Sequence, residues 1–165
     1  MSGYVQKARA SDILFIAGSI RSDDRREIEA MSTLSPTQAL WRSYRMSTSC
    51  WTGFVDNDPI LMFGVAPLTV LGGVGSPWLI GTDAILKVKH QFLRMNAQFV
   101  EKMNETYPVL HNYVDVRNTH SVRWLKWLGF KFDDPVEYGL NGEKFYPFMR
   151  ERGQHNVHIR TEVRF

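Results

Sequence analysis

The chain has 165 residues, of which 44% are hydrophobic and 13% aromatic. It is therefore long enough to bury a core in one domain and too apolar for a disordered protein. No apolar stretch reaches membrane-spanning length and the N-terminus lacks a signal-peptide pattern, so we expect an intracellular protein without a membrane partner. The lone Cys50 agrees with a reducing compartment. The net charge of +3 is mild, so a nucleic-acid partner is not expected.

The first part of the chain predicts one strand followed by helices. The expected elements are a strand over 4–8, a helix capped by Ser11-Asp12, a charged helical segment over 21–31, and a helix from Ser35-Pro36 to Met46. Serine and aspartate are common N-caps, and proline favours the first helical position. The charges of the segment 21–31 repeat at i,i+3 and i,i+4 spacing, which is typical of a solvent-exposed helix face.

The middle of the chain predicts a hairpin, another strand and the longest helix. Strands over 50–55 and 60–65 flank a turn at residues 56–59, and the glycine-rich stretch 72–75 is expected to be a loop before a strand over 78–80. Apolar residues then repeat every three to four positions from Ile85 to Met103, which predicts a helix that ends at Tyr107-Pro108.

The last part predicts a strand over 109–116, a short helix from Asn118 that stops at Gly129, and a final pair of strands around Asn141-Gly142. The predicted fold class is α+β, with a mixed, mostly antiparallel sheet and helices on its faces. We expect residues 1–150 to form a single domain and residues 151–165 to be a polar C-terminal tail.

The strand, the Asn at the turn, the short helix and the terminal Gly129-Phe130 together resemble the later half of the GNAT acyltransferase fold. The predicted order of elements matches that fold across nearly the whole chain. The resemblance implies an acyl-CoA N-acyltransferase architecture, in which the fourth and fifth strands splay apart for pantetheine. An active enzyme would use acetyl-CoA and would take its catalytic residues from Asp24, Glu27 and Asn118. The residues that would bind the cofactor are Leu79, Ile80, Gly81, Thr82, Lys87 and Lys89.

Two features that GNAT enzymes commonly use are missing. Their pyrophosphate loop usually reads Gln/Arg-x-x-Gly-x-Gly/Ala, because glycines let backbone N–H groups approach the phosphates. Here residues 82–89 contain no glycine, and Asp83 adds a negative charge that Lys87 and Lys89 could offset. The position of the general-acid tyrosine is occupied by Leu125, which cannot donate a proton. Both departures favour a non-catalytic or degenerate member of the fold.

Within the GNAT-like proteins, the chain is similar to a group encoded by tailed bacteriophages, the relatives of the T7-type internal virion (head morphogenesis) protein. The stretches that carry this similarity are 8–12, 21–27, 63–65, 77–82, 92–94, 112–115 and 118–130. It implies a role in morphogenesis of the virion head or internal core, in the virion or the host cytoplasm, with other virion proteins such as the portal or internal core proteins as partners. The alternative is an acetyl-CoA-dependent N-acyltransferase that modifies a host or phage amine. The histidines form no ligand pattern, so no metal site is expected.

Overall fold

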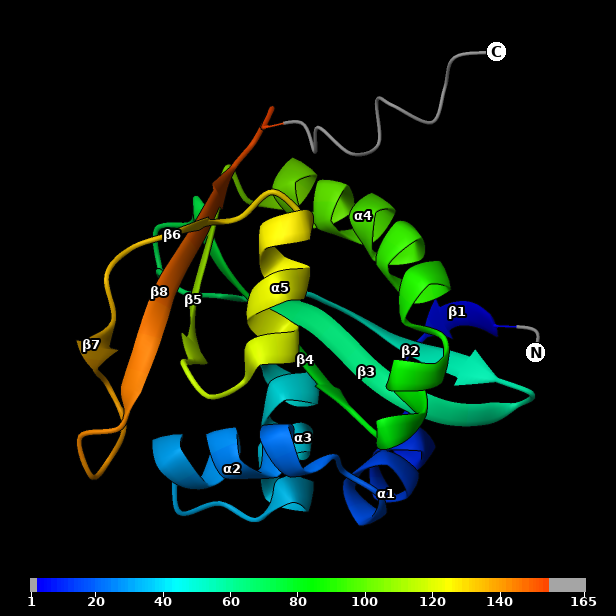
Figure 1. Cartoon of the computed structure of the whole chain (residues 1–165). Coiled ribbons are helices and arrows are strands. Elements are labelled where there is room, and N and C mark those ends of the chain that lie inside the picture. The colour runs from blue at the N-terminus through cyan, green and yellow to red at the C-terminus, as the bar shows by residue number, and fades with distance from the viewer. Residues whose placement is uncertain (1–2, 155–165) are drawn as a thin grey trace.

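The sheet of this protein is mixed and mostly antiparallel. The computed structural model describes residues 3–154 (Figure 1). Its eight-stranded sheet has the order β1-β2-β3-β4-β5-β8-β6, with β7 paired to β8. Among the described strands only β4 and β5 run parallel. The strands are β1 (Gly3–Lys7), β2 (Ser49–Val55), β3 (Asp58–Pro67), β4 (Val74–Gly81), β5 (Val109–Asp115), β6 (Lys131–Phe132), β7 (Val136–Glu137) and β8 (Lys144–Glu151). The predicted α+β class is confirmed.

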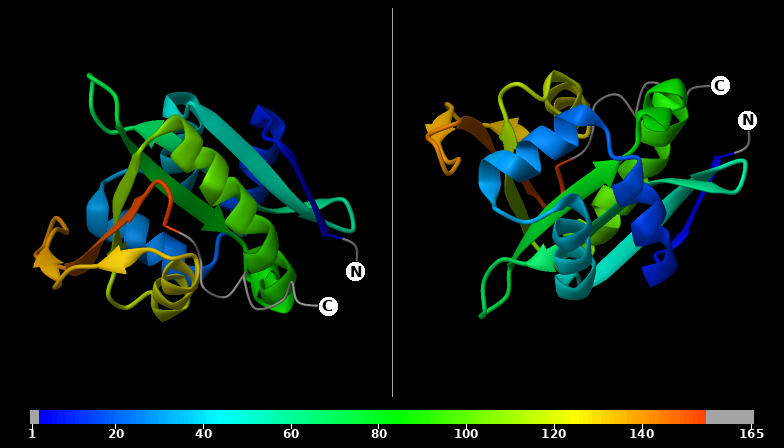
Figure 2. Two further views of the ribbon diagram at one scale, coloured as in Figure 1. Left: turned by 90° about the horizontal axis from the view of Figure 1, so that it is seen from above. Right: turned by 90° about the horizontal axis from the view of Figure 1, so that it is seen from below.

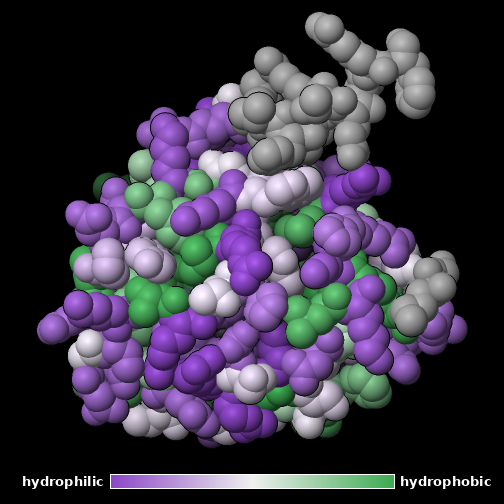
Figure 3. Space-filling view, in the orientation of Figure 1, coloured by the Kyte–Doolittle hydropathy of each residue, from purple (hydrophilic) through white to green (hydrophobic). Residues whose placement is uncertain are grey.

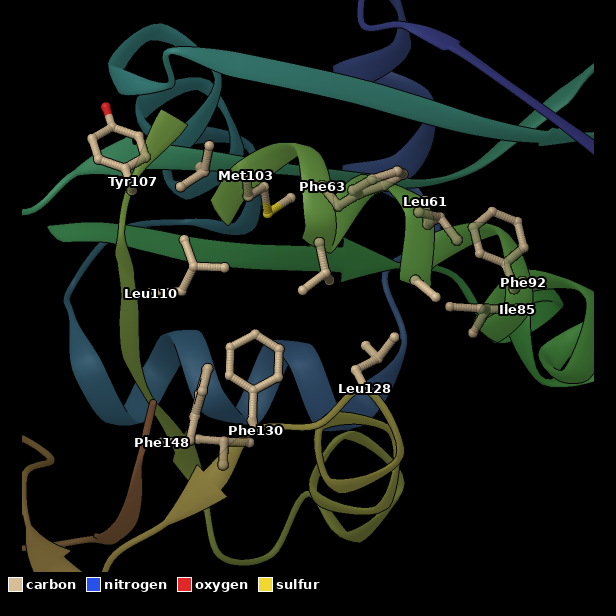
Figure 4. Packing of buried hydrophobic residues seen from close by; sticks show 14 of the residues in the cluster. Leu61, Phe63, Ile85, Phe92, Met103, Tyr107, Leu110, Leu128, Phe130 and Phe148 are labelled. Carbon is tan, nitrogen blue, oxygen red and sulfur yellow. The ribbon is translucent and has the colours of Figure 1, made fainter. Parts of the chain in front are cut away.

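Helices cover both faces of this sheet, as the two views of Figure 2 show. The helical elements are α1 (Ala10–Gly18), α2 (Ser22–Met31), α3 (Pro36–Met46), the 3-10 helix η1 (Asp83–Lys87), α4 (Lys89–Thr106) and α5 (Thr119–Trp127). Side chains alternate along β3, so Met62 packs with α1–α3 while Leu61 and Phe63 pack with the core around α4 and α5. Figure 4 shows this second core, where Phe130 and Phe148 meet edge to face at 5.2 Å.

The predicted hairpin of β2 and β3 is confirmed, and its turn is tighter than residues 56–59. Asp56 and Asn57 have positive φ angles of 48° and 71°, and β3 begins directly after them at Asp58. Aspartate and asparagine tolerate this left-handed conformation better than most side chains do. Two successive residues with positive φ match the twist of paired strands, which explains the short connection.

Two predictions about the N-terminal helices are wrong in part. Helix α1 starts at Ala10 with Arg9 as its N-cap, and the Asp12 carboxylate accepts the Arg9 N–H at 3.0 Å from inside the first turn. Helix α2 is not simply an exposed charged face. The side chains of Arg21 and Asp24 are each only 3% exposed, whereas the pair of Asp23 and Arg26 is partly exposed as expected.

Two boundaries in the middle of the chain also differ from the prediction. The segment from Ile85 to Met103 is split, because Ile85 lies in η1 and the α-helix begins at Lys89. Apolar residues of η1 and of α4 pack into the same core. The apolar residues of the two helices therefore follow one another in the sequence as if they belonged to a single helix. Strand β4 begins at Val74, inside the glycine-rich stretch that was expected to be a loop. Its first residues pair with β5, which the sequence pattern could not show.

The segment just after β8 contacts helix α4 through Arg152. Helix α5 begins at the predicted N-cap Asn118 and ends before Gly129 as predicted, and Gly129 has a positive φ of 87°. Strands β7 and β8 form the predicted final pair. Strand β8 continues to Glu151, and Arg152 donates to the last carbonyls of α4. Most of the predicted tail, residues 155–165, lies outside the described residues, so the tail remains a prediction. Across residues 3–154, no helix is both long and apolar enough to cross a bilayer.

Gly53 allows β2 to approach helix α4. A Cβ atom at Gly53 would lie 2.2 Å from Cζ of Phe92, while one at Gly18 meets no atom within 4 Å. Phe92 is buried in the core, so it cannot simply turn away. We expect Gly53→Ala to lower the free energy of unfolding by about 1–3 kcal/mol through overpacking. Gly18→Ala should leave it unchanged or raise it, and equal effects of the two changes in urea denaturation would contradict this account.

Candidate functional site

The gap between β4 and β5 opens into a cavity of the described structure. The two strands pair only where Val74 and Gly75 meet Val109 and Leu110. Both strands continue for several residues beyond this point, so they diverge toward their carboxyl ends (Figure 1). A cavity of about 430 Å³ lies at this divergence. Carboxyl ends of neighbouring parallel strands are a common place for ligand sites in proteins.

The walls of the cavity are largely apolar and come from both layers of helices. Helices α2 and α3 contribute residues such as Met31 and Met46, and helices α4 and α5 contribute residues such as Val100 and Leu125. Met31 and Met46 are 38% and 52% exposed and mark the rim on the α2–α3 side. Leu125, which stands at the position of the general-acid tyrosine, lines the cavity and offers no proton. On the face of α4 and α5, apolar surface is broken into small patches (Figure 3).

A buried ion pair lies at the start of α2. The Arg21 guanidinium donates to both carboxylate oxygens of Asp24 at 2.8 and 2.7 Å and to Ser121 Oγ on α5 at 2.9 Å. It also stacks over the Trp124 ring, 5.1 Å from the centroid. Burial raises the pKa of Asp24, and the contact with Arg21 acts against that rise. The two buried charges therefore compensate each other, and further hydrogen bonds inside the protein stabilise the pair.

Glu27, also on α2, directs its carboxylate toward β5 and α5. Glu27 Oε1 accepts the backbone N–H of Asp115 at 2.8 Å, and Oε2 accepts Nδ2 of Asn118 at 3.0 Å. Asn118 Oδ1 in turn accepts the N–H of Ser121 and caps α5. Burial raises the pKa of Glu27 to about 7, although both hydrogen bonds favour the charged form. The structure thus brings together the three residues named as catalytic candidates, Asp24, Glu27 and Asn118.

The residues named as cofactor ligands are more scattered. Leu79 and Ile80 line the cavity. Gly81 donates its N–H to Asp24 Oδ2 at 2.8 Å, and its carbonyl accepts the N–H of Arg21 at 3.0 Å. The Thr82 hydroxyl is turned to the carbonyl of Ile60 on β3.

The two lysines of the predicted cofactor site lie apart from the cavity. Lys87 ends η1 and Lys89 begins α4, both exposed and neither among the residues that line the cavity. Their place at the start of α4 agrees with the region expected to face a pyrophosphate. Their assignment as cofactor ligands stays a prediction.

Sequence similarity connects the middle of the chain to a phage protein. The family described as "Bacteriophage T7, probable scaffold protein Gp13" matches residues 60–138, from β3 to β7. The probable scaffold protein gp13 of Escherichia phage T7 is 34% identical over 82 residues. This alignment covers 47% of the chain and 58% of the T7 protein, so the chain spans somewhat more than half the length of that relative. The predicted similarity to a T7-type phage protein is confirmed.

Solved structures identify the architecture. Ard1 from Thermoplasma volcanium superimposes with a TM-score of 0.68 at 11% identity, covering 92% of this chain and 99% of that one. A GCN5-related N-acetyltransferase from Kribbella flavida gives 0.66 at 17% identity, covering 90% and 97%. A GNAT-family acetyltransferase from Streptococcus pneumoniae gives 0.64 at 11% identity, covering 92% and 100%. The chain has the GNAT fold. At these identities the likeness concerns the fold, and transfer chemistry does not follow from it.

The residues present do not fit the way in which GNAT enzymes hold acetyl-CoA. Pantetheine would need free backbone groups on the β5-facing edge of β4, and both groups of Gly81 are occupied by Arg21 and Asp24. The start of η1 carries Asp83, in the region where the cofactor phosphates would be expected. Negative charge at a helix N-terminus competes with the phosphates that would bind there.

Asn112 is a residue of the gap that the sequence did not predict as a site residue. Asn112 donates from Nδ2 to the carbonyl of Pro77 at 2.8 Å, and its Oδ1 accepts the N–H of Tyr113 at 2.8 Å. Asn112 thereby spans β4 and β5. Its position within a strand-like apolar run could have indicated this role. Asparagine is disfavoured in strand interiors unless its side chain has a local hydrogen-bond partner.

Proposed function

We propose that this protein acts in morphogenesis of a phage virion head or internal core, and that it uses the GNAT fold as a rigid binding scaffold. The observation that carries the proposal is the similarity of residues 60–138 to the T7 probable scaffold protein family. The matched segment contains β4 and β5, and Asn112 of β5 donates to Pro77 of β4. Portal and internal core proteins are the expected partners.

An exposed apolar loop within the matched segment supports a binding role. The connection between β3 and β4 carries Leu68, Val70 and Leu71, which are 52%, 105% and 100% exposed. Fully exposed apolar side chains that lie together mark interaction surfaces more often than isolated ones do. The adjacent Gly72 and Gly73 have positive φ angles of 79° and 89°, a turn conformation that glycine adopts without strain.

The test is co-purification from infected cells and immunodetection in purified particles. We expect the tagged chain to co-purify with portal or internal core proteins and to be present in assembling or mature particles. The double change Val70→Ser with Leu71→Ser should reduce this association, whereas Leu14→Ser should not. Leu14 is a matched control because it is 69% exposed but lies on α1, outside the matched segment. Recovery of the chain only in free form would count against the proposal.

The alternative function is an acetyl-CoA-dependent N-acyltransferase. It is favoured by the pKa of about 7 for Glu27, because a general base works best when its pKa lies near the working pH. Glu27 also lines the cavity. Saturable binding of acetyl-CoA in a calorimetric titration would support this alternative and justify a search for an amine acceptor. An absence of binding would leave the scaffold role.

A further inference from the structure

We infer that the gap between β4 and β5 is bridged by the chain's own side chains, Asn112, Asp24 and Glu27, which we call the clasp. These side chains take up backbone groups that a cofactor would otherwise use. The inference is independent of the proposed partners. It gives Asp24 and Glu27 the role of fastening α2 across the diverging strands, instead of the role of a general base.

The hydrogen-bonding pattern shows which backbone groups of β4 face the gap. The N–H of Thr82 bonds to Ile60 on β3 at 2.8 Å. Because successive residues of a strand direct their backbone groups to opposite sides, those of Gly81, Leu79 and Pro77 point toward β5. Proline lacks an N–H, so Pro77 contributes only its carbonyl.

The same reasoning applies to β5. The N–H of Val116 bonds to Lys144, next to β8, at 3.1 Å. The backbone groups of Asp115 and Tyr113 therefore point away from β8 and toward β4. Beyond the short parallel pairing, these groups on the two strands lie too far apart to bond to each other, and they need other partners.

Asn112 supplies the first bridge. Its Nδ2 donates to the Pro77 carbonyl and its Oδ1 accepts the Tyr113 N–H, both at 2.8 Å. One side-chain amide thus replaces a hydrogen bond between strands by connecting an acceptor on β4 to a donor on β5. Asparagine can do this because its side chain carries both a donor and an acceptor.

Helix α2 supplies the second bridge. Asp24 and Glu27 are three residues apart, which places them on one face of the helix. Asp24 accepts the last N–H of β4, from Gly81, and Glu27 accepts the last N–H of β5, from Asp115, each at 2.8 Å. Arg21 completes the contact, because its own N–H donates to the carbonyl of Gly81.

Leu79 lies between the two bridges, and its backbone groups bond to neither of them. It lines the cavity, and its backbone groups face the gap. The clasp therefore leaves one stretch of β4 edge facing the cavity and closes the stretches on both sides of it. An elongated pantetheine arm would have to displace side chains that are already hydrogen-bonded to these backbone groups, which costs more than displacing water.

Amide hydrogen exchange measured by NMR on the full chain tests the clasp. We expect the amides of Gly81, Tyr113 and Asp115 to be protected about tenfold or more above the amide of Leu79. Asn112→Ala should speed exchange at Tyr113 and leave Gly81 and Asp115 as they were, because each bridge has its own anchor. Asn141→Ala, at the exposed tip of the β7–β8 connection, is the matched control. Protection of the three amides no greater than that of Leu79 would overturn the inference.

Calorimetric titration with CoA gives a second, separate readout. We expect no saturable heat with the unaltered protein up to about 1 mM CoA, the range of weak specific binding. Saturable binding below that concentration would overturn the clasp as a barrier, whether or not the amides stay protected. Neither outcome bears on co-purification with virion proteins, so failure of the clasp and failure of the proposed function can be told apart.

Discussion

Asp24→Ala is expected to lower the free energy of unfolding by about 3–5 kcal/mol, because it leaves a buried guanidinium without its counter-charge. The side chain of Arg21 is only 3% exposed, so the guanidinium depends on partners inside the protein. The N–H of Gly81 also loses its acceptor. The Nη1 atom of Arg21 already lacks a hydrogen-bond partner among residues 3–154, and Ser121 Oγ is the side-chain acceptor that the guanidinium would keep. Urea denaturation at neutral pH, followed by circular dichroism, measures the change.

The same helix provides a matched control. Asp23 pairs with Arg26 three residues away at 2.6 Å, but these side chains are 22% and 44% exposed. Asp23→Ala should therefore cost no more than about 1 kcal/mol, as surface ion pairs usually do. The two changes remove the same side chain from adjacent positions and differ mainly in burial. Similar losses for both would show that the pair of Arg21 and Asp24 does not stabilise the fold as proposed.

Local signals in the sequence were sufficient for most of the architecture. Asn118 and Gly129 mark both ends of α5, since each satisfies a requirement of a helix terminus that neighbouring residues determine. Asp56-Asn57 marks the β2–β3 turn for a similar reason. The order of elements, read from hydrophobic periodicity, is also the order that GNAT structures share.

The errors arise where tertiary contacts decide the structure. The charges of α2 have the spacing of an exposed face, and only the packing of α2 against β4 and α5 buries Arg21 and Asp24. Periodicity cannot distinguish these two from Asp23 and Arg26. The split between η1 and α4 has the same origin, because Ile85 contributes to one core with Phe92 whichever helix type carries it.

Only part of the candidate site was predictable as a set of residues, and none of it as an arrangement. Asp24, Glu27 and Asn118 were selected through the resemblance to an enzyme fold, and they do lie together. What the sequence could not show is that the carboxylates accept backbone N–H groups of two different strands. Such contacts depend on where β4 and β5 diverge, and Asn112 enters the site for the same reason.

Glu27→Gln is expected to flatten the pH dependence of stability between about pH 4.5 and 7. Burial raises the pKa of Glu27 from 4.5 to about 7 in the folded protein. A raised carboxyl pKa means that the folded state keeps a proton that the unfolded state has released. The resulting stabilisation is complete below pH 4.5 and is lost as the pH rises through 7, and it amounts to about 3 kcal/mol. The variant lacks this titration.

The measurement is the free energy of unfolding of both proteins from pH 4.5 to 8.5. The amide of the variant can accept only one of the two donors that face Glu27, from Asp115 and Asn118. This loss is the same at every pH. The test is therefore the slope of the free energy of unfolding against pH, and not its absolute value. Glu29→Gln is the control, because Glu29 lies exposed on the same helix and its change should preserve the slope. Parallel curves for the unaltered protein and Glu27→Gln would mean that Glu27 stays charged across this range, with its two hydrogen bonds outweighing burial.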